Sequence, residues 1–157
     1  MRENISLRGG YVIEIIDGSG KLIDVVEISN KLMSINRELR TEMLLGAYTG
    51  GADALEIKYF AFGIGTAPVT VNDTRLDREV YRKQITQISS PSSGVVRSVV
   101  SLGSVECNTT IKEIGVFCGS SATDEADSGT LMSRVAVNIE KNSNITLNII
   151  RTDTCTI

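Results

Sequence analysis

Short segments rich in β-branched residues recur along this chain, and turn-forming residues separate them every 10 to 15 residues. Ile, Val and Thr number 18, 14 and 14, which is 46 of the 157 residues. Branched side chains pack well on the pleated, half-buried surface of a sheet. Short strands with regular turns between them are typical of antiparallel sandwiches. The sequence therefore predicts a mainly β fold, an antiparallel β-sandwich.

The chain is expected to open with an arm and a hairpin. Residues 1–10 are polar and end in two glycines, which predicts a flexible arm, and residues 11–157 are predicted to form one sandwich domain. Apolar runs over 11–16 and 21–26 flank Asp17-Gly18-Ser19-Gly20, and an Asp-Gly pair between such runs is a strong hairpin signal. Further strands are predicted over 55–62, 79–89, 95–102, 109–117, 131–139 and 144–151.

One amphipathic helix interrupts the strands. Apolar residues recur at helical spacing at Leu32, Ile35, Leu39 and Met43, with polar residues between them. Ser29 is a candidate N-cap, and the chain turns to glycine from Gly46 onward. We expect a helix over about residues 29–46, which packs across a sheet or covers one end of it.

Composition excludes several classes of function. The chain has no histidine, so Ser-His-Asp triads, Cys-His dyads and histidine-containing zinc sites are excluded, and we expect no enzyme, catalytic residue, metal or cofactor. Sixteen basic and 19 acidic residues give a net charge of −3, which argues against a nucleic-acid partner. No apolar run approaches the roughly 18 residues of a membrane span. The first residues lack the apolar core of a signal peptide, so we expect a cytoplasmic chain.

Charged residues and cysteines leave two alternatives open. The basic residues around Arg75, Arg78 and Arg82 alternate with Asp77 and Glu79, which favours local or inter-subunit ion pairs over nucleic-acid binding. The odd set Cys107, Cys118 and Cys155 has no metal-ligand spacing. Buried or idle thiols are the default interpretation, and an inter-chain disulfide, for which Cys155 near the C-terminus is best placed, is the alternative.

Three segments in order resemble motifs of bacteriophage tail proteins. The first comprises Gly63-Ile64-Gly65-Thr66-Ala67-Pro68 and then Asp73-Thr74-Arg75-Leu76-Asp77-Arg78-Glu79-Val80-Tyr81-Arg82, similar to a "G-x-G-T-x-P" loop followed by "D-T-x-L-x-x-E-x-x-R". The second, Ile111-Lys112-Glu113-Ile114-Gly115-Val116-Phe117, resembles "I-x-E-I-G-L-F". The third, Gly129-Thr130-Leu131-Met132-Ser133-Arg134, resembles "G-x-L-x-A-R". Together they cover roughly residues 58–139, and the N-terminal hairpin and helix lie outside the resemblance.

The resemblance implies a structural virion protein of a phage or phage-like particle. Such a protein assembles as an oligomeric ring or adaptor in the tail, baseplate, tail-fibre attachment or neck and collar region, within the host cytoplasm. Its partners would be copies of itself and other virion proteins. Glu113 and Arg134 lie in predicted strands, and we expect them on a sheet face that meets another subunit. The alternative is a receptor- or carbohydrate-binding sandwich module of a tail appendage, with loops 63–72 and 119–129 at the ligand.

Overall fold

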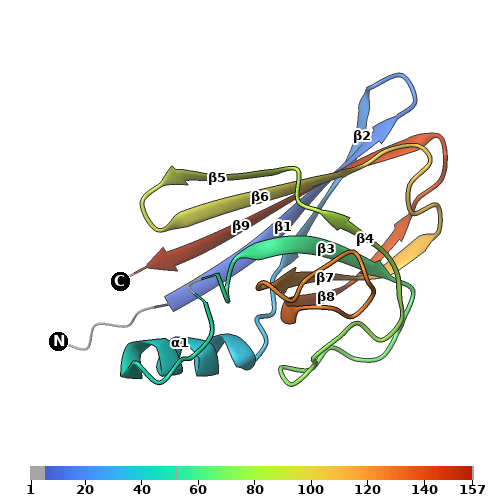
Figure 1. Cartoon of the computed structure of the whole chain (residues 1–157). Helices are drawn as coiled ribbons and strands as arrows, with labels where there is room; N and C mark the ends of the chain where they lie inside the picture. Colours follow the sequence, from blue (N-terminus) through green and yellow to red (C-terminus); the bar gives the residue numbers. More distant parts are fainter. Residues whose placement is uncertain (1–5, 52, 157) are drawn as a thin grey trace. The chain divides into compact units, whose positions relative to one another are not determined.

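A computed structural model describes residues 6–51 and 53–156 (Figure 1). The structure is mainly β, with two antiparallel sheets and one short helix. The predicted fold class, a mainly β protein of the antiparallel sandwich type, is therefore confirmed. In chain order the elements are β1 (Ser6–Asp17), β2 (Leu22–Ser29), α1 (Ile35–Leu45), β3 (Ile57–Gly63), β4 (Glu79–Gln84), β5 (Gln87–Ser92), β6 (Val95–Leu102), β7 (Thr110–Cys118), β8 (Thr130–Glu140) and β9 (Ile145–Thr156).

The chain divides into two compact units, each built from separate stretches of sequence. The five-stranded unit takes the described parts of residues 1–30, 85–108 and 141–157, with strand order β2-β1-β9-β6-β5. The four-stranded unit takes residues 31–84 and 109–140, with α1 and strand order β4-β3-β7-β8. The segment 79–89, predicted as one strand, is therefore two short strands in different sheets, because alternation of side chains does not specify which neighbour a strand pairs with.

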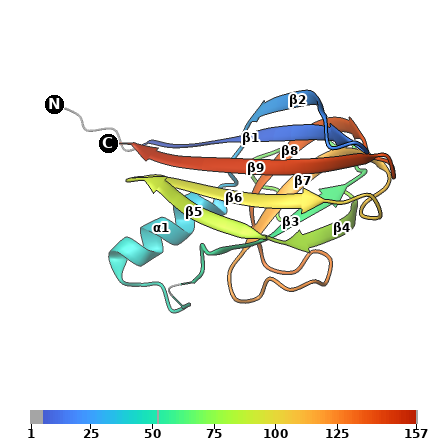
Figure 2. The same ribbon diagram turned by 90° about the horizontal axis from the view of Figure 1, so that it is seen from above.

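The five-stranded sheet is organised around β9, which pairs with β1 on one side and β6 on the other (Figure 2). Its strands β1, β6 and β9 alternate in burial, as expected for a sheet with one buried face. One face buries apolar side chains completely, among them Ile13, Val100 and Ile149, while their neighbours Val12 and Ile150 on the other face are half-buried. The hairpin predicted around Asp17-Gly18 joins β1 to β2, and the Asp17 carboxylate accepts hydrogen bonds from the backbone N–H groups of Ser19 and Lys21.

Strand β1 begins at Ser6, so residues 6–10 of the predicted flexible arm belong to the sheet, and residues 1–5 lie outside the described part. These five residues pair with the end of β9, from Ser6 opposite Thr156 to Gly10 opposite Thr152. A Cβ atom at Gly9 would lie 2.6 Å from the Asn30 side-chain nitrogen and 2.7 Å from Asp153 Oδ1. The glycine that suggested flexibility instead permits a close approach within a strand.

Helix α1 is shorter than predicted because the chain before it pairs with β8. Leu32 forms an isolated bridge with Ser133, and the Met33 N–H donates to the Met132 carbonyl at 3.1 Å. Ser29 belongs to β2, and it is the Ser34 carbonyl that accepts the first helical hydrogen bonds. The predicted C-terminal end is confirmed: Gly46 has a φ of +66°, a left-handed conformation that glycine adopts without steric cost.

The four-stranded unit has its own apolar core. Met33, Ala61, Leu76, Phe117, Ala122 and Leu131 are buried against one another, with Ile35, Tyr59 and Val69 packed at the margin. Met33 lies two residues before the start of α1, and Leu76 and Ala122 come from the loops before β4 and after β7. The two loops that flank this sheet are therefore anchored by apolar side chains as well as by the polar contacts described below.

Candidate functional site

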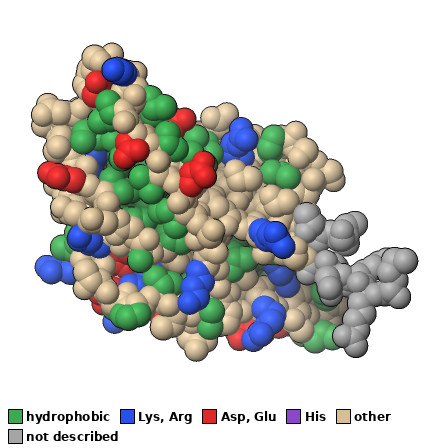
Figure 3. All heavy atoms as spheres, turned by 180° about the vertical axis from the view of Figure 1, so that it is seen from behind, with side chains coloured by type: hydrophobic (Ala, Val, Ile, Leu, Met, Phe, Trp, Pro, Cys, Tyr) green, Lys and Arg blue, Asp and Glu red, His purple; other side chains and the backbone are tan. Residues whose placement is uncertain are grey.

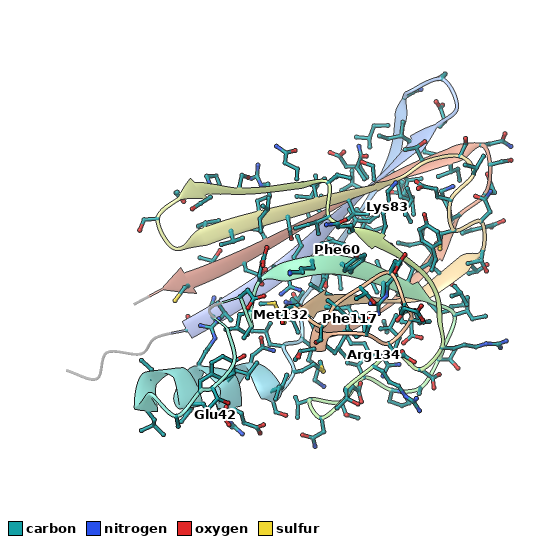
Figure 4. The ribbon with its side chains drawn as sticks, viewed as in Figure 1. Glu42, Phe60, Lys83, Phe117, Met132 and Arg134 are labelled. Carbon is teal, nitrogen blue, oxygen red and sulfur yellow. The ribbon has the colours of Figure 1, made fainter. Side chains whose placement is uncertain are left out.

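Several charged residues of the three motif segments meet in the four-stranded unit. Glu113 on β7 and Arg134 on β8 lie on adjacent antiparallel strands, and their side chains are 1% and 4% exposed. The Arg134 Nε donates to Glu113 Oε2 at 2.8 Å. Figure 4 labels Arg134 together with Phe117, which lies on the neighbouring strand β7. We call Asp73, Asp77, Glu113 and Arg134, with the backbone groups that they bind, the Glu113–Arg134 network.

The Glu113 carboxylate is satisfied by backbone donors as well as by Arg134. Its Oε1 accepts the N–H groups of Gly65 at 3.1 Å and Arg78 at 2.8 Å, and its Oε2 accepts the N–H of Asp77 at 3.0 Å. With Arg134 this makes four hydrogen bonds to one buried carboxylate, which offset the cost of removing the charge from water. Glu113 thus joins β7 to both ends of the loop between β3 and β4.

The two glycines of the Gly-x-Gly segment make room for this carboxylate. A Cβ atom at Gly65 would lie 2.6 Å from Glu113 Oε1, and one at Gly63 would lie closer still. Neither glycine has a positive φ, so glycine is not needed at these positions for a left-handed backbone conformation. Glycine is required at both positions because the backbone approaches a buried charge closely.

Arg134 completes the network with two more acceptors. Its Nη1 donates to Asp73 Oδ2 at 2.7 Å and its Nη2 donates to the Ala67 carbonyl at 2.9 Å. Burial works to raise the pKa of Asp73, but hydrogen bonds from Thr70 and from Arg134 outweigh it, so the pKa lies below its ordinary value. The same contacts to Asp73 and Glu113 raise the pKa of Arg134 against the opposing effect of burial. Asp73 and Arg134 thus each stabilise the ionised form of the other.

Asp77 fixes the turn of the same loop. Its Oδ2 accepts the backbone N–H groups of Thr66 at 2.9 Å and Ala67 at 3.1 Å. Three carboxylates, those of Asp73, Asp77 and Glu113, therefore hold loop 64–78, and all three belong to the motifs.

A second cluster of motif residues centres on Arg82 in β4. Its guanidinium contacts Glu79 at two points, Nε to Oε1 at 2.6 Å and Nη2 to Oε2 at 2.9 Å, and both side chains are 3% exposed. The guanidinium also lies over the ring of Phe117, 4.4 Å from its centroid. We call this the Arg82 cluster.

The Arg82 cluster holds the loop between β7 and β8, residues 119–129. Arg82 Nη1 donates to the carbonyl of Ser128 at 3.0 Å and to that of Thr123 at 2.9 Å. Glu79 Oε2 accepts the N–H of Asp127 at 3.1 Å. Asp127 has a φ of +62°, an unusual conformation for a residue other than glycine. The loop is therefore held at several backbone positions.

Five of the seven residues predicted to contact another subunit therefore have partners in their own chain. These are Asp77, Glu79, Arg82, Glu113 and Arg134. Glu113 and Arg134 were expected on a sheet face that meets a second surface, and both are instead buried within the chain. A buried charge is stable only next to an opposite charge and hydrogen-bond partners, and residues of the same chain provide both. Arg75 and Arg78 are exposed, and their contact with another subunit stays a prediction.

The three cysteines are all free, and they differ in access. Cys107 and Cys118 are buried, and burial raises the pKa of the Cys107 thiol to about 11. Cys155 is exposed near the end of β9. An inter-chain disulfide stays a prediction, and Cys155 is the thiol with the access that it needs.

Sequence reasoning missed one buried ion pair in the five-stranded unit. The Arg151 side chain is 0% exposed, and its Nε and Nη2 donate to the two carboxylate oxygens of Asp153, each at 2.8 Å. The Arg151 guanidinium also lies 5.7 Å from the Tyr11 ring centroid. The signal was present, because residues at i and i+2 in a strand share a face, and Leu147 and Ile149 place that face in the core.

The described surface offers shallow hollows. One of about 300 Å³ in the five-stranded unit is lined by Glu14, Gln87, Ser89, Arg97, Val99, Ser101, Asn148 and Ile150, with no aromatic ring for a sugar to stack on. Within residues 6–51 and 53–156, no group of three or more Cys, Asp or Glu residues is arranged to hold a metal ion. In the same ranges, no helix is long and apolar enough to cross a membrane.

Hydrophobic side chains gather on one part of the five-stranded unit. In Figure 3 they lie at the upper left, over the β1–β2 hairpin, with Asp and Glu side chains around them. The exposed apolar residues of β2 are Leu22, Ile23 and Val25, which are 50%, 52% and 42% exposed. An exposed apolar group rimmed by charge is typical of a protein–protein contact surface.

No protein-family model, curated protein or solved structure matches this chain.

Proposed function

We propose that the chain is a structural protein of a phage or phage-like particle. In this role it assembles with copies of itself, as a ring or adaptor in the tail, baseplate, fibre-attachment or neck region. It performs no catalysis there. Its partners are other copies and neighbouring virion proteins.

The observation that carries the proposal is the meeting of the three motifs in space. Each motif alone is short, and a chance resemblance would give no reason for their charged residues to bind one another. Gly65 and Asp77 from the first motif, Glu113 from the second and Arg134 from the third are nevertheless joined by direct hydrogen bonds. The resemblance therefore follows a set of residues that depend on each other physically, which supports a shared fold with the tail proteins and, through it, the structural role.

The nature of the two networks supports an architectural role over a chemical one. The side chains of Glu79, Arg82, Glu113 and Arg134 are buried and paired, and the two networks are bonded also to backbone groups of two loops. Such an arrangement fixes loop shape, and it leaves the charges engaged rather than open to a substrate. A subunit that must present the same surface to each neighbour benefits from loops of fixed shape.

The test is direct detection of the chain in particles. Particles released by the host that carries this gene would be purified by density gradient, analysed by mass spectrometry and labelled with gold-conjugated antibodies against the recombinant chain. We expect a fixed ratio of this chain to the major tail protein, with label at the tail, baseplate or neck. Intact particles without this chain would overturn the proposal. Labelled particles combined with specific binding on a glycan array would instead favour the receptor-binding alternative.

A further inference from the structure

Lys141 is buried next to a side-chain amide in the five-stranded unit. The residue follows directly on β8 and is 2% exposed. Its ε-amino group donates to Asn108 Oδ1 at 2.9 Å and to the Asn142 carbonyl at 3.0 Å. Both acceptors are uncharged, so these hydrogen bonds do not supply the opposite charge that a buried ammonium group requires. The surroundings of Lys141 therefore favour the neutral amine more than water does.

The pKa of Lys141 agrees with its surroundings. Burial lowers that pKa below its ordinary value, and the nearby Cys107 and Glu106 groups, which act to raise it, offset burial only in part. A lysine with a lowered pKa has a larger share of the neutral amine at neutral pH, and the neutral amine is the nucleophilic form. Lys141 thus has both a fixed position and an increased capacity to act as a nucleophile.

The Asn108 amide is held with its oxygen toward Lys141. The Asn108 Nδ2 donates to the Ser104 carbonyl at 2.9 Å, while Oδ1 accepts from the lysine. The amide carbon lies one C=O bond, about 1.2 Å, from the oxygen that the lysine nitrogen contacts. Holding an amine this close to an amide carbon replaces a bimolecular encounter by a reaction within one molecule. Asn108 is exposed, so a group released from its amide can leave to solvent.

We propose that Lys141 and Asn108 form an intramolecular isopeptide bond. The neutral Lys141 Nζ attacks Asn108 Cγ, an amide C–N bond forms, and the bond between Cγ and Nδ2 breaks. One proton passes from Nζ to Nδ2, which leaves as ammonia, so the step needs no oxidant and no other reactant. Glu106 belongs to the same turn as Asn108, where its Oε2 accepts the Gly103 N–H at 2.8 Å, and its carboxylate carries this proton.

The bond closes a covalent ring of residues 108–141, the stretch of chain that contains β7 and β8. Like a disulfide, such a ring restricts the unfolded chain and so stabilises the folded one. The inference goes beyond the proposed virion role and does not depend on it.

A second lysine–asparagine pair provides a control within the chain. Lys112 Nζ donates to Asn138 Oδ1, so the same two kinds of atom are in contact, but this pair is exposed. Water stabilises an exposed ammonium group, which is not a nucleophile. We expect no bond between Lys112 and Asn138.

The mass of the intact chain tests the proposal. Loss of ammonia lowers the mass of the 16.9 kDa chain by about 17 Da, and we expect this loss in most molecules of the purified protein after incubation at neutral pH. Trypsin should then release residues 98–112 joined to residues 135–151, because a modified Lys141 is no longer a cleavage site. Tandem mass spectrometry of the joined peptides would identify the two linked residues.

Matched variants assign the reacting groups. K141R and N108S each remove one of them and should keep the mass calculated from the sequence. K112M removes the exposed lysine of the control pair and should still lose about 17 Da. E106Q keeps an oxygen for the Gly103 N–H but cannot carry a proton in the same way, so its cross-linked fraction should be smaller than that of the wild type at equal age.

A wild-type chain that keeps its sequence mass would overturn the proposal, whether or not each variant folds. The same loss of mass without joined peptides, as a succinimide at an asparagine gives, would also overturn it. A cross-linked fraction that E106Q leaves unchanged would overturn the role of Glu106. Circular dichroism would show that each variant folds, so that a lost cross-link reports on the missing group. None of these outcomes bears on the presence of the chain in particles, so failure of the isopeptide bond and failure of the proposed function are separable.

Discussion

Replacing Arg134 with methionine tests whether the Glu113–Arg134 network stabilises the fold. Methionine has a similar length and fills much of the same space without charge. The substitution removes hydrogen bonds to Glu113 at 2.8 Å, Asp73 at 2.7 Å and the Ala67 carbonyl at 2.9 Å. It also leaves the Glu113 carboxylate, 1% exposed, without its cation.

The cost follows from that uncompensated charge. Removing one partner of a buried ion pair destabilises proteins by about 3–5 kcal/mol. The three backbone N–H groups that remain on Glu113 still stabilise its charge, which favours the lower half of that range. Domains typically have free energies of unfolding of roughly 5–15 kcal/mol, so the loss is a large fraction of the total. R134K keeps the charge, but one ammonium group cannot reach three separate acceptors, and it should cost about 1–3 kcal/mol.

Guanidinium chloride unfolding, followed by circular dichroism, would give the free energy of unfolding of each variant. R75M is the matched control, because Arg75 is exposed on the same loop and its replacement should change stability by less than about 0.5 kcal/mol. In a double-mutant cycle with E113Q, the double variant should lose at least about 1 kcal/mol less than the sum of the single losses. If R134M costs no more than R75M, the network does not stabilise the fold and the reasoning is refuted.

The same variant makes a prediction about pH. The folded-state pKa of Asp73 lies below its ordinary value of 3.8, so its ionisation contributes stability above about pH 4, and that contribution is lost as pH falls through the folded pKa. R134M removes one of the contacts that lower this pKa. The stability difference between wild type and R134M should therefore narrow as the pH falls from about 5 to about 2. A difference that stays constant over this range would contradict the role assigned to Asp73.

Three further predictions concern other parts of the chain. G9A should lower the free energy of unfolding, measured in urea, by about 1–3 kcal/mol, because the new Cβ would lie 2.6 Å from a side-chain nitrogen. G10A should lower it less, because its Cβ meets one backbone oxygen at 3.4 Å, and equal losses would contradict this reasoning. R82L should remove the hydrogen bonds that hold loop 119–129, so that endoproteinase Glu-C cuts after Glu125 at least about tenfold faster than in the wild type. An unchanged rate of cleavage would show that Arg82 does not hold the loop. In the folded protein, Ellman's reagent should react quickly with the Cys155 thiol alone, and C155S should abolish this fast reaction. Fast reaction of all three thiols would contradict the burial of Cys107 and Cys118.

Local patterns were sufficient to predict most elements of the fold. The alternation of residues 144–151 is confirmed in β9, and the Asp17-Gly18 turn and the helix end at Gly46 lie where expected. These signals depend on backbone preferences and side-chain periodicity within a few residues, which the sequence contains directly. Predictions that depended on a distant partner were wrong: the start of the helix is displaced to Ile35 because Leu32 pairs with Ser133, a residue about 100 positions away.

The candidate site shows the same division. Sequence alone identified the charged residues at 73–82, 113 and 134 and grouped them by resemblance, but it assigned Glu113 and Arg134 to a contact between subunits. Only the tertiary structure places Glu113 under the backbone of Gly65 and beside Arg134 on the next strand, where both are buried. The physical reason is that a charge is identified by its residue type, whereas its partner and its burial depend on the pairing of β7 with β8 and on the path of loop 64–78. The sequence by itself determined that this is a β protein with one helix and which charges matter, and tertiary structure alone decided that those charges hold the chain's own loops.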